Sequence, residues 1–478
     1  MTPVAVSQTR PSADASAARP ASVDVFGCSW KGRRVTVVGL GKSGRAAAEL
    51  LCRLGCEVRV TDAQDSPVLR AAREALLEYG AADVELGGHT TRAVEAADLI
   101  VTSPGIHEDT PALAWARARQ LPVISEIELA FHFCRAPVVA VTGTNGKSSA
   151  VTLLTAILRA ARRAAVACGN LGTPFSSVVE ALPPEGVAVV EVSSFQLLGC
   201  ERFRPSVGML LIIGANHLDR HHDHLAYVQA KMRLFARQTR EDWAVLNAGD
   251  PEIAARGAGL TARSVWFGRG AVNAPAFALA PQTQGAIGPS VQAVLQAARI
   301  FGIPDAFTWQ QVRAFRGLEH RMEPAGRVRG VTFVNDAKST TPESLMYALR
   351  RTRGPVVPII GGRNKGLDLS PMVPLLSDPR VRGVVLIGEA RAELCALLGS
   401  AGGGAPPVRE AGTLEEAVET ARGLAGPGAT VLFSPACASF DMFRNFEARG
   451  AAFKAVVARL GVAALAASLA AGAGGDRT

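Results

Sequence analysis

The residues most suited to chemistry lie in a glycine-rich loop. An apolar run, 138–141, leads into Thr142-Gly143-Thr144-Asn145-Gly146-Lys147-Ser148-Ser149, and an apolar stretch with helical spacing follows. Such a loop between a strand and a helix turns backbone N–H groups onto phosphates at the positive end of the helix dipole. Lys147 would meet the β- and γ-phosphates, and the Ser148 hydroxyl would bind Mg²⁺. Val141 stands where the Walker pattern has its first glycine, but the flanking strand and helix favour a nucleoside triphosphate site over a plain glycine turn.

Three more residues from the middle of the chain are candidates for the same site. Glu191 ends an apolar run, where an acid beside a phosphate loop would serve as an Mg²⁺ ligand. His217 is the first of four histidines in 216–224 and is assigned to a metal or a phosphate, whereas the other three are expected at the surface. No cysteine lies nearby to favour zinc. Lys231 borders an apolar helical stripe and is expected to point inward, although a lysine that reaches solvent from an amphipathic helix has the same spacing.

A second glycine loop lies nearer the N-terminus. Gly39-Leu40-Gly41-Lys42-Ser43-Gly44 follows an apolar run, and Asp62 ends the next one. This spacing is typical of turns that bind dinucleotides. It indicates a site for a nucleotide-like pyrophosphate, unless the glycines serve only close packing of a helix on a strand. The turn 102–106, with Ser103, would contact anions at the same edge.

The last third of the chain has polar segments of the same kind. Residues 335–342, 361–365 and 434–441 each follow an apolar run, and Phe446 comes shortly afterwards. Two lysines lie among them, so together they describe an anion-binding edge suited to a substrate that carries carboxylates. Each segment alone would also suit helix capping.

These segments need a scaffold that gathers them, and the apolar pattern supplies it. Short apolar runs alternate with longer helical patterns, which predicts parallel βα units. Open sheets of this kind bind ligands at the carboxyl ends of their strands, which is where the polar segments lie. The predicted buried strands are 35–40, 58–61, 99–102, 138–142, 187–192, 207–213, 331–335, 356–360, 384–387 and 430–433.

A chain of 478 residues is too long for a single hydrophobic core. We predict an α/β protein with a disordered leader and three domains. The Rossmann-like N-terminal domain would bind a nucleotide-like pyrophosphate, the central P-loop ATPase-like domain would have a mostly parallel sheet, and the C-terminal domain would again be Rossmann-like. The expected ranges are 1–30 for the leader, then 31–126, 127–317 and 318–478.

Composition narrows the possible functions and locations. The net charge is +9, but no dense basic run has interleaved aromatic residues, which argues against nucleic acid as a partner. Eight scattered cysteines favour a reducing compartment. No basic start precedes an apolar signal core, and the alanine-rich run after Arg459 is too short to span a bilayer. We therefore expect a cytoplasmic protein without membrane insertion. A monomeric state is a separate expectation that these features do not determine.

Together these segments resemble the Mur ligase family over about residues 31–460, in the family's order. The loop 143–148 is similar to the family's ATP loop, which lacks the first Walker glycine. The other similar segments are 170–172, 191–196, 216–219, 320–321 and 335–338, followed by 434–441 and 445–447, which are similar to the branch that adds D-glutamate.

The resemblance implies roles for individual residues. It implies contacts with ATP at Gly143, Thr144, Asn145, Gly146, Lys147, Ser148, Ser149, Arg321 and Asp336. Contacts with a UDP-linked substrate are implied at Ser43, Asp62, Ser103, Asn170 and Gln196. Contacts with the amino acid are implied at Lys338, Thr340, Lys365, Ser439 and Phe446. The implied metal site has Ser148, Glu191, His217 and a carboxylated Lys231, and catalysis would depend on Lys147, Lys231, His217 and Glu191.

The implied activity is ATP-dependent, ADP-forming addition of D-glutamate to UDP-N-acetylmuramoyl-L-alanine in peptidoglycan synthesis, with Mg²⁺ as cofactor. The substrate carboxylate would attack the γ-phosphate to give an acyl phosphate, which the amino group of D-glutamate would then attack. Because one anion approaches another, charge neutralisation by Lys147 and Mg²⁺ is expected to dominate. Three reactants held mainly by different domains imply closure of the third domain on the second. Two segments depart from the family pattern, namely 285–290, which lacks its His and Asn, and Ala63-Gln64 beside the expected uracil pocket.

Two other classes of protein could use parts of this sequence. A nicotinamide-dependent oxidoreductase would use Gly39–Gly44 but leaves the Lys147 loop unexplained. A nucleotide-gated binding or scaffold protein would not turn over ATP in an amino-acid-dependent way. Within the family, an L-alanine-adding or a folylpolyglutamate-type ligase is the nearest alternative, and residues 434–447 argue against both.

Overall fold

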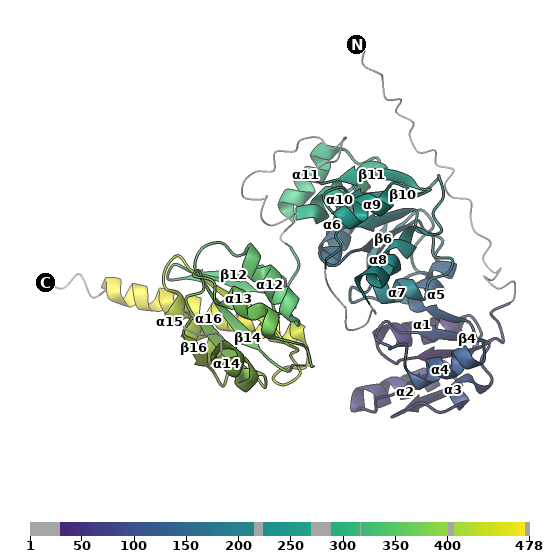
Figure 1. The fold of residues 1–478 in the computed structure, drawn as a ribbon, viewed down its shortest axis with the longest axis horizontal. Coiled ribbons are helices and arrows are strands. Elements are labelled where there is room, and N and C mark those ends of the chain that lie inside the picture. Colours follow the sequence, from purple (N-terminus) through teal and green to yellow (C-terminus); the bar gives the residue numbers. More distant parts are fainter. Residues whose placement is uncertain are drawn as a thin grey trace, which may run out of the picture. The chain divides into compact units, whose positions relative to one another are not determined.

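The computed structural model describes residues 29–214, 223–268, 288–315, 317–364, 366–399 and 406–473, with side chains to residue 464. The chain divides into two compact units, Met1–Phe315 and Arg316–Thr478, and each is considered by itself (Figure 1). The predicted leader is almost wholly outside the described residues, as are His217 and Lys365.

The first sheet has five parallel strands in the order β3-β2-β1-β4-β5. These strands are β1 (Arg34–Val38), β2 (Glu57–Asp62), β3 (Asp83–Leu86), β4 (Leu99–Thr102) and β5 (Val123–Ser125). Helices α1 (Lys42–Arg53) and α2 (Pro67–Tyr79) contribute Leu50, Leu51 and Leu76 to the core on one face. On the other face α3 (Arg92–Glu95) and α4 (Pro111–Ala118) pack on Val38 and Ile100. The sheet is therefore doubly wound, which places its ligand-binding edge at the carboxyl ends of the strands.

The second sheet is also parallel, with six strands in the order β11-β10-β9-β6-β8-β7. The strands are β6 (Val138–Thr142), β7 (Ala165–Gly169), β8 (Val187–Glu191), β9 (Val207–Leu210), β10 (Trp243–Asn247) and β11 (Arg263–Phe267). One face packs on α6 (Lys147–Ala160), α10 (Gly288–Ile300) and α11 (Asp305–Ala314). The other packs on α5 (Glu126–Phe133), α7 (Ser194–Leu198) and α8 (His224–Met232). The central strands β6, β8 and β9 are buried on both faces, as their continuous apolar runs require.

Two buried carboxylates of α5 join the first sheet to the second. Glu128 accepts hydrogen bonds from the backbone N–H groups of residues 201, 202 and 203 at 3.1, 2.9 and 2.9 Å. Glu126 accepts from the Ser176 N–H at 2.7 Å and from the Ser176 hydroxyl at 2.6 Å. Burial raises the pKa of Glu126, and its Oε2 has no hydrogen-bond partner among the described residues. A single hydrophobic core runs across this joint.

Replacing Glu128 with alanine is expected to destabilise the first unit by roughly 3–5 kcal/mol, because three backbone N–H groups around this buried side chain, that of Phe203 itself buried, lose their acceptor. Chemical denaturation of the intact chain measures the loss. The exposed Glu185 is a matched control, and Glu185→Ala should stay within about 0.5 kcal/mol of the wild type. Equal stability of the two variants would show that Glu128 does not stabilise the joint.

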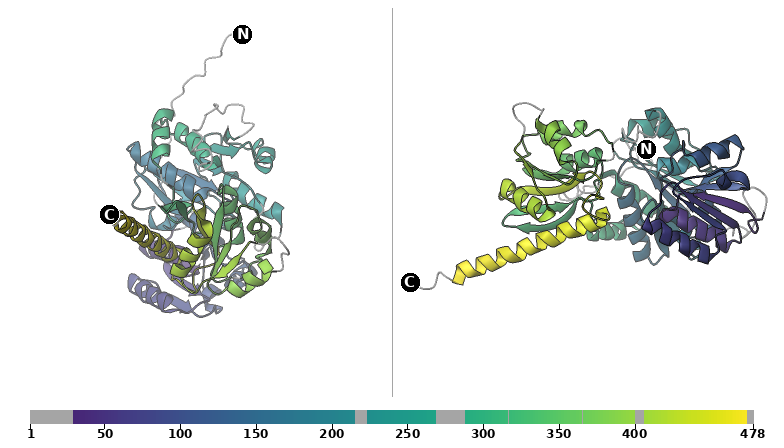
Figure 2. Two further views of the ribbon diagram at one scale, coloured as in Figure 1. Left: turned by 90° about the vertical axis from the view of Figure 1, so that its left-hand side faces the viewer. Right: turned by 90° about the horizontal axis from the view of Figure 1, so that it is seen from below.

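The second unit has one six-stranded sheet in the order β12-β13-β17-β14-β15-β16, in which only the β12–β13 pair is antiparallel. The strands are β12 (Glu323–Val328), β13 (Val331–Asn335), β14 (Val356–Gly361), β15 (Val384–Ile387), β16 (Val408–Glu410) and β17 (Thr430–Ala436). Helices α15 (Leu414–Ala425) and α16 (Phe446–Ala473) cover one face, and α12 (Pro342–Arg351), α13 (Val373–Leu376) and α14 (Arg391–Gly399) cover the other. Figure 2 shows α16 continuing past the sheet of its own unit.

The predicted α/β class with mostly parallel sheets is confirmed, and each of the ten predicted strands occurs. Within the described residues seven further strands were not predicted, namely β3, β5, β7, β10, β11, β12 and β16. Most of these are short or lie at a sheet edge, and β12 carries a proline and a glycine, so they lack a long apolar run. No helix in the described part of the chain is long and apolar enough to span a membrane. The domain boundaries stay predictions.

Candidate functional site

The glycine loop has the backbone geometry of an anion cradle. Gly143 and Gly146 have φ angles of +145° and +85°, which other residues rarely adopt. Gly146 is also the N-cap of α6, and no side chain caps this helix. A Cβ at Gly146 would lie 2.1 Å from the Ser290 hydroxyl oxygen, which adds to the preference for glycine that the positive φ angle sets. Lys147 Nζ donates to the Gly143 carbonyl at 2.8 Å and the Thr144 carbonyl at 3.1 Å, and therefore lies over the loop itself.

Lys231 is buried beside this loop, at 2% exposure. Burial lowers the pKa of its amine well below the usual value; the charge of Lys147 lowers it further, and Glu191 opposes the shift. The Lys231 Nζ atom lies 4.5 Å from the centroid of the Tyr227 ring. The predicted inward orientation is confirmed, and an uncharged amine is the form of lysine that can act as a nucleophile.

Glu191 lies at the end of β8, paired in register with Val141 of β6. Its Oε1 accepts from Asn170 Nδ2 at 3.2 Å, whereas its buried Oε2 has no hydrogen-bond partner among the described residues. Gln196 Oε1 accepts from the Ser193 N–H at 2.8 Å, which leaves the buried Gln196 Nε2 without a partner. The edge of the second sheet thus has one open carboxylate oxygen and one open amide donor.

The buried Glu191 Oε2 atom, which lacks a hydrogen-bond partner in the described residues, is suited to binding a divalent cation. A buried carboxylate oxygen without a donor is costly unless a cation or another donor meets it. Ser148 is buried in the first turn of α6, on the loop that follows β6. The described ranges contain no cluster of three His, Cys, Asp or Glu residues that could hold a metal, and the predicted ligands among them, apart from Lys231, are Glu191 and Ser148. His217 lies outside those ranges.

In the first sheet, Asp62 and Ser103 fix the second glycine loop from two sides. Asp62 accepts from the Leu40 N–H at 2.7 Å, and the Ser103 hydroxyl donates to the Gly39 carbonyl at 2.8 Å. A Cβ at Gly44 would lie 1.7 Å from the Gly39 carbonyl oxygen, so close packing also requires this glycine. Ser43 is half-buried in the first turn of α1, whose N-cap has no side-chain hydrogen bond. The structure therefore brings the predicted residues Ser43, Asp62 and Ser103 to one turn.

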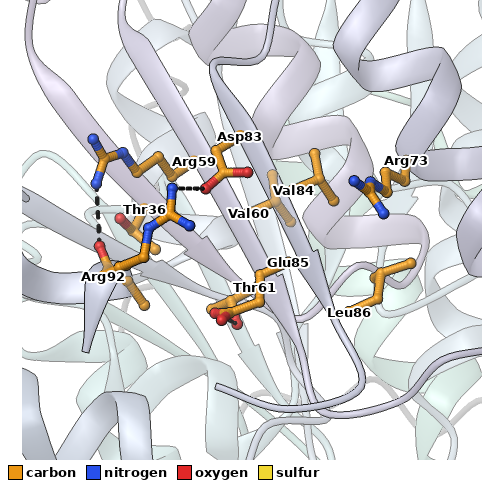
Figure 3. A pocket seen from close by; sticks show the side chains of 11 residues that line it. Thr36, Arg59, Val60, Thr61, Arg73, Asp83, Val84, Glu85, Leu86 and Arg92 are labelled. Carbon is orange, nitrogen blue, oxygen red and sulfur yellow. Dashed lines mark hydrogen bonds and ion pairs between the residues drawn. The ribbon is translucent and has the colours of Figure 1, made fainter. Parts of the chain in front are cut away.

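A cavity of about 240 Å³ lies elsewhere on the first sheet, over β2 and β3 (Figure 3). Arg92 donates to Asp83 at 3.2 Å, and Arg59 donates to the Arg92 carbonyl at 3.2 Å. None of the predicted site residues lines this cavity.

In the second unit, Asp336 follows β13 and is 6% exposed. It accepts from the Ser434 hydroxyl at 2.8 Å and from the Met322 N–H at 3.1 Å. Burial raises its pKa to about 6, against the lowering effects of these hydrogen bonds and of the Arg321 charge. The two predicted nucleotide-contacting residues of this unit, Arg321 and Asp336, therefore interact.

The raised pKa of Asp336 predicts a pH-dependent stability. Since the folded state holds the proton more tightly than an unfolded chain with its pKa near 3.8, stability falls as the pH rises from about 4 to about 6. The loss is roughly 3 kcal/mol, and Asp336→Asn does not undergo it. Hydrogen exchange of the β13 amides at pH 4 and pH 7 measures this stability. Between pH 4 and pH 7, the protection of these amides in Asp336→Asn should rise relative to their protection in the wild type. A pH-independent difference would contradict the assignment.

The amino-acid residues predicted for the second unit lie at its strand ends. Lys338 Nζ lies 5.8 Å from the centroid of the Phe446 ring. Thr340 lies in the same segment as Lys338 and is half-buried, and Ser439 is buried after β17. The structure thus places Lys338, Thr340, Ser439 and Phe446 at the carboxyl edge of one sheet; Lys365 is outside the described residues.

Three contacting residues were missed from the sequence. The Tyr227 hydroxyl lies 2.9 Å from the Thr144 hydroxyl, and its ring lies against Lys231. Its position four residues before Lys231, on the same helix face, was the available signal. Asp250 accepts from the Ile213 N–H at 2.7 Å and is the N-cap of α9 (Pro251–Gly257). The available signal was an Asp directly before a Pro, which is typical of a helix start. Ser290 contacts the Gly146 carbonyl at 3.3 Å, and no local pattern marks it.

Three family models match the chain in order. The Mur ligase MurD-like N-terminal domain matches residues 33–125, the Mur ligase middle domain matches 141–286, and the Mur ligase glutamate ligase domain matches 320–437. The chain belongs to the Mur ligase family.

Among its relatives are proteins named UDP-N-acetylmuramoylalanine--D-glutamate ligase. The one from Acidobacterium capsulatum is 40% identical over 458 residues, which cover 91% of this chain and 98% of the relative. The one from Geobacter sp. is 40% identical, with 89% and 98% covered. The one from Anaeromyxobacter dehalogenans is also 40% identical, with 89% and 97% covered.

Solved structures share the fold at low identity. MurF ligase from Thermotoga maritima in complex with ADP matches with a TM-score of 0.55 and 16% identity, over 90% of this chain and 96% of that one. UDP-N-acetylmuramate-alanine ligase MurC from Thermotoga maritima matches with a TM-score of 0.51 and 17% identity, over 84% and 95%. These matches support the three-domain Mur ligase architecture.

Proposed function

We propose that this chain is the ATP-dependent ligase that adds D-glutamate to UDP-N-acetylmuramoyl-L-alanine and forms ADP and phosphate, the activity that the names of its relatives indicate. The observation that carries the proposal is the convergence of Lys147, Glu191 and Lys231, from three different elements, at one edge of the second sheet. Two lysines and a carboxylate with an open oxygen are suited to a nucleoside triphosphate and its cation.

In the first step, the terminal carboxylate of the UDP-linked substrate attacks the γ-phosphate of ATP, giving an acyl phosphate and ADP. The backbone N–H groups at the start of α6, where no side chain caps the helix, hold the phosphates, and Lys147 moves from its own loop carbonyls to the phosphate oxygens. Its charge offsets the repulsion between two anions, which is the main barrier to this step.

In the second step, the amino group of D-glutamate attacks the acyl carbon, and the adduct expels phosphate. Lys338, Thr340, Lys365, Ser439 and Phe446 are proposed to hold the amino acid. Asn170 and Gln196 are proposed to contact the muramoyl part, and the open Gln196 Nε2 is a donor available for it. Ser43, Asp62 and Ser103 are proposed to position the uridine diphosphate at the second glycine loop, Gly39–Gly44.

The cation is proposed to be Mg²⁺, held by Ser148, Glu191, His217 and the carboxylated Lys231. When bound, it would polarise the phosphate oxygens and neutralise developing charge. The low pKa of Lys231 supports carboxylation, because only the uncharged amine reacts with CO₂. Arg321 and Asp336 are proposed as nucleotide contacts. A cytoplasmic location and a monomeric state stay predictions from the sequence.

Phosphate release from ATP tests the function directly. The intact protein is given Mg·ATP and UDP-N-acetylmuramoyl-L-alanine with a panel of D- and L-amino acids. We expect release with D-glutamate and only background with L-alanine, L-glutamate or no amino acid. Release that is independent of the amino acid, or highest with L-alanine, would reject the proposal, and NADH binding would favour an oxidoreductase.

A further inference from the structure

The largest fully buried side chain in the described part of the structure is a cation, Arg449 of α16. Its side chain is 1% exposed, in the second unit. A buried guanidinium normally pairs with a carboxylate, because burying an unpaired charge costs several kcal/mol. The partners of Arg449 therefore need an explanation.

Arg449 bonds to backbone carbonyls of two segments at the carboxyl edge of the sheet. Its Nη1 donates to the Cys437 carbonyl at 3.0 Å, and its Nη2 donates to the Ala337 carbonyl at 3.0 Å. A longer contact of 3.5 Å joins Nη2 to the Ser339 carbonyl. One side chain thus links the segment after β13 to the segment after β17.

A third segment, after β14, is held against the same group. Arg363 and Ala438 exchange two backbone hydrogen bonds, at 2.9 and 3.0 Å. A Cβ at Gly362 would lie 2.3 Å from the Ala438 carbonyl oxygen and 3.2 Å from Arg449 Nη1, so glycine is required for this approach. The three polar segments that we propose to hold the amino acid all meet around Arg449.

The positive charge of Arg449 has no compensating partner within bonding distance in the described residues. The buried Nε has no hydrogen-bond partner. Asp441 acts on Arg449 only through its charge, and its Oδ2 already accepts from the Glu389 N–H at 2.9 Å. Burial lowers the pKa of Arg449 to about 10, so the guanidinium remains charged at neutral pH.

A second unsatisfied group lies in the same place. The Ser339 hydroxyl is buried and has no hydrogen-bond partner in the described ranges. It stands between Lys338 and Thr340, two of the proposed amino-acid contacts. A hydroxyl without a hydrogen-bond partner and a buried cation without a bonded carboxylate thus lie behind the same edge.

We propose that Arg449 is a positioning residue that selects an amino acid with an acidic side chain, by aligning the three strand-end segments and adding an unpaired positive charge behind them. The proposal rests on the proposed function. It assigns the preference for a dicarboxylate to a buried charge that need not contact the substrate, because Coulomb interactions persist over several ångströms in a poorly solvated interior.

The test compares D-glutamate with its neutral isostere D-glutamine, in the intact enzyme. Arg449→Met should lower kcat/KM for D-glutamate by roughly tenfold or more, mainly through a higher KM. The ratio of kcat/KM for D-glutamate to kcat/KM for D-glutamine should fall by a similar factor. KM values for ATP and the UDP-linked substrate should stay within about twofold. Arg459→Met, on the same helix but exposed, is the matched control and should leave all of these values unchanged.

Arg449→Lys keeps the positive charge without the fork of the guanidinium. We expect it to retain most of the D-glutamate to D-glutamine ratio with reduced kcat, and it remains informative if the methionine variant fails to fold. Loss of the ratio in a lysine variant with a wild-type melting temperature would overturn the proposal, as would an equal loss for both amino acids in a folded Arg449→Met. Absence of D-glutamate-dependent phosphate release in the wild type would instead reject the proposed function.

Discussion

Replacing Lys147 with methionine is expected to lower turnover by roughly 10²–10³. The chain lays this ammonium over the two carbonyls of its own loop, at 2.8 and 3.1 Å, within a side chain's reach of phosphates bound at the start of α6. In the proposed first step a carboxylate approaches a polyanion, so a fixed cation stabilises the transition state more than the ground state. The loss should therefore appear mainly in kcat.

The measurement is phosphate release at saturating ATP, UDP-linked substrate and D-glutamate. Methionine keeps the length and the apolar stem of lysine, so the loop should still fold. The control is Arg159→Met near the other end of α6, whose side chain is exposed. A Lys147→Met enzyme with more than about a tenth of the wild-type kcat would show that this lysine does not stabilise the transition state.

Where the main ligand-binding edges lie could be predicted from the sequence. Strand β6 occupies the predicted range, and Glu191 lies next to it because both runs form neighbouring parallel strands. The inward orientation of Lys231 followed from the helical period of its apolar neighbours. These features are local: an apolar run, a period and a glycine loop are each written in consecutive residues.

Contacts between distant segments could not be predicted. The bond between Tyr227 and Thr144 and the contact between Ser290 and Gly146 depend on how helices pack on the second sheet. The same is true of Arg449, whose partners are backbone carbonyls that any residue would supply. The hydrogen bonds that Asp62 and Ser103 make with the glycine loop could not be predicted either, because they depend on the conformation of the loop.

Replacing Lys231 with alanine is expected to abolish most of the activity, by a factor at least as large as for Lys147. The amine is buried, its pKa is well below the usual value, and both Lys147 and Glu191 act on its charge. An uncharged amine can add to CO₂ and, on loss of a proton, become a carbamate anion, which would be a partner for Lys147 and for the metal ion. Alanine removes that anion and leaves the site with one carboxylate fewer.

Carboxylation makes this prediction separable from a loss of packing. Depletion of CO₂ should lower the activity of the wild type, and bicarbonate should restore it, whereas bicarbonate should restore Lys231→Ala poorly. Labelled CO₂ should give a carbamate carbon resonance in the wild type that Lys231→Arg lacks. Gln229→Ala, exposed on the same helix, serves as the control and should retain activity. Acidification should also lower wild-type activity, because protonation of Lys231 blocks its reaction with CO₂; a fully active Lys231→Ala enzyme would exclude this role for the lysine.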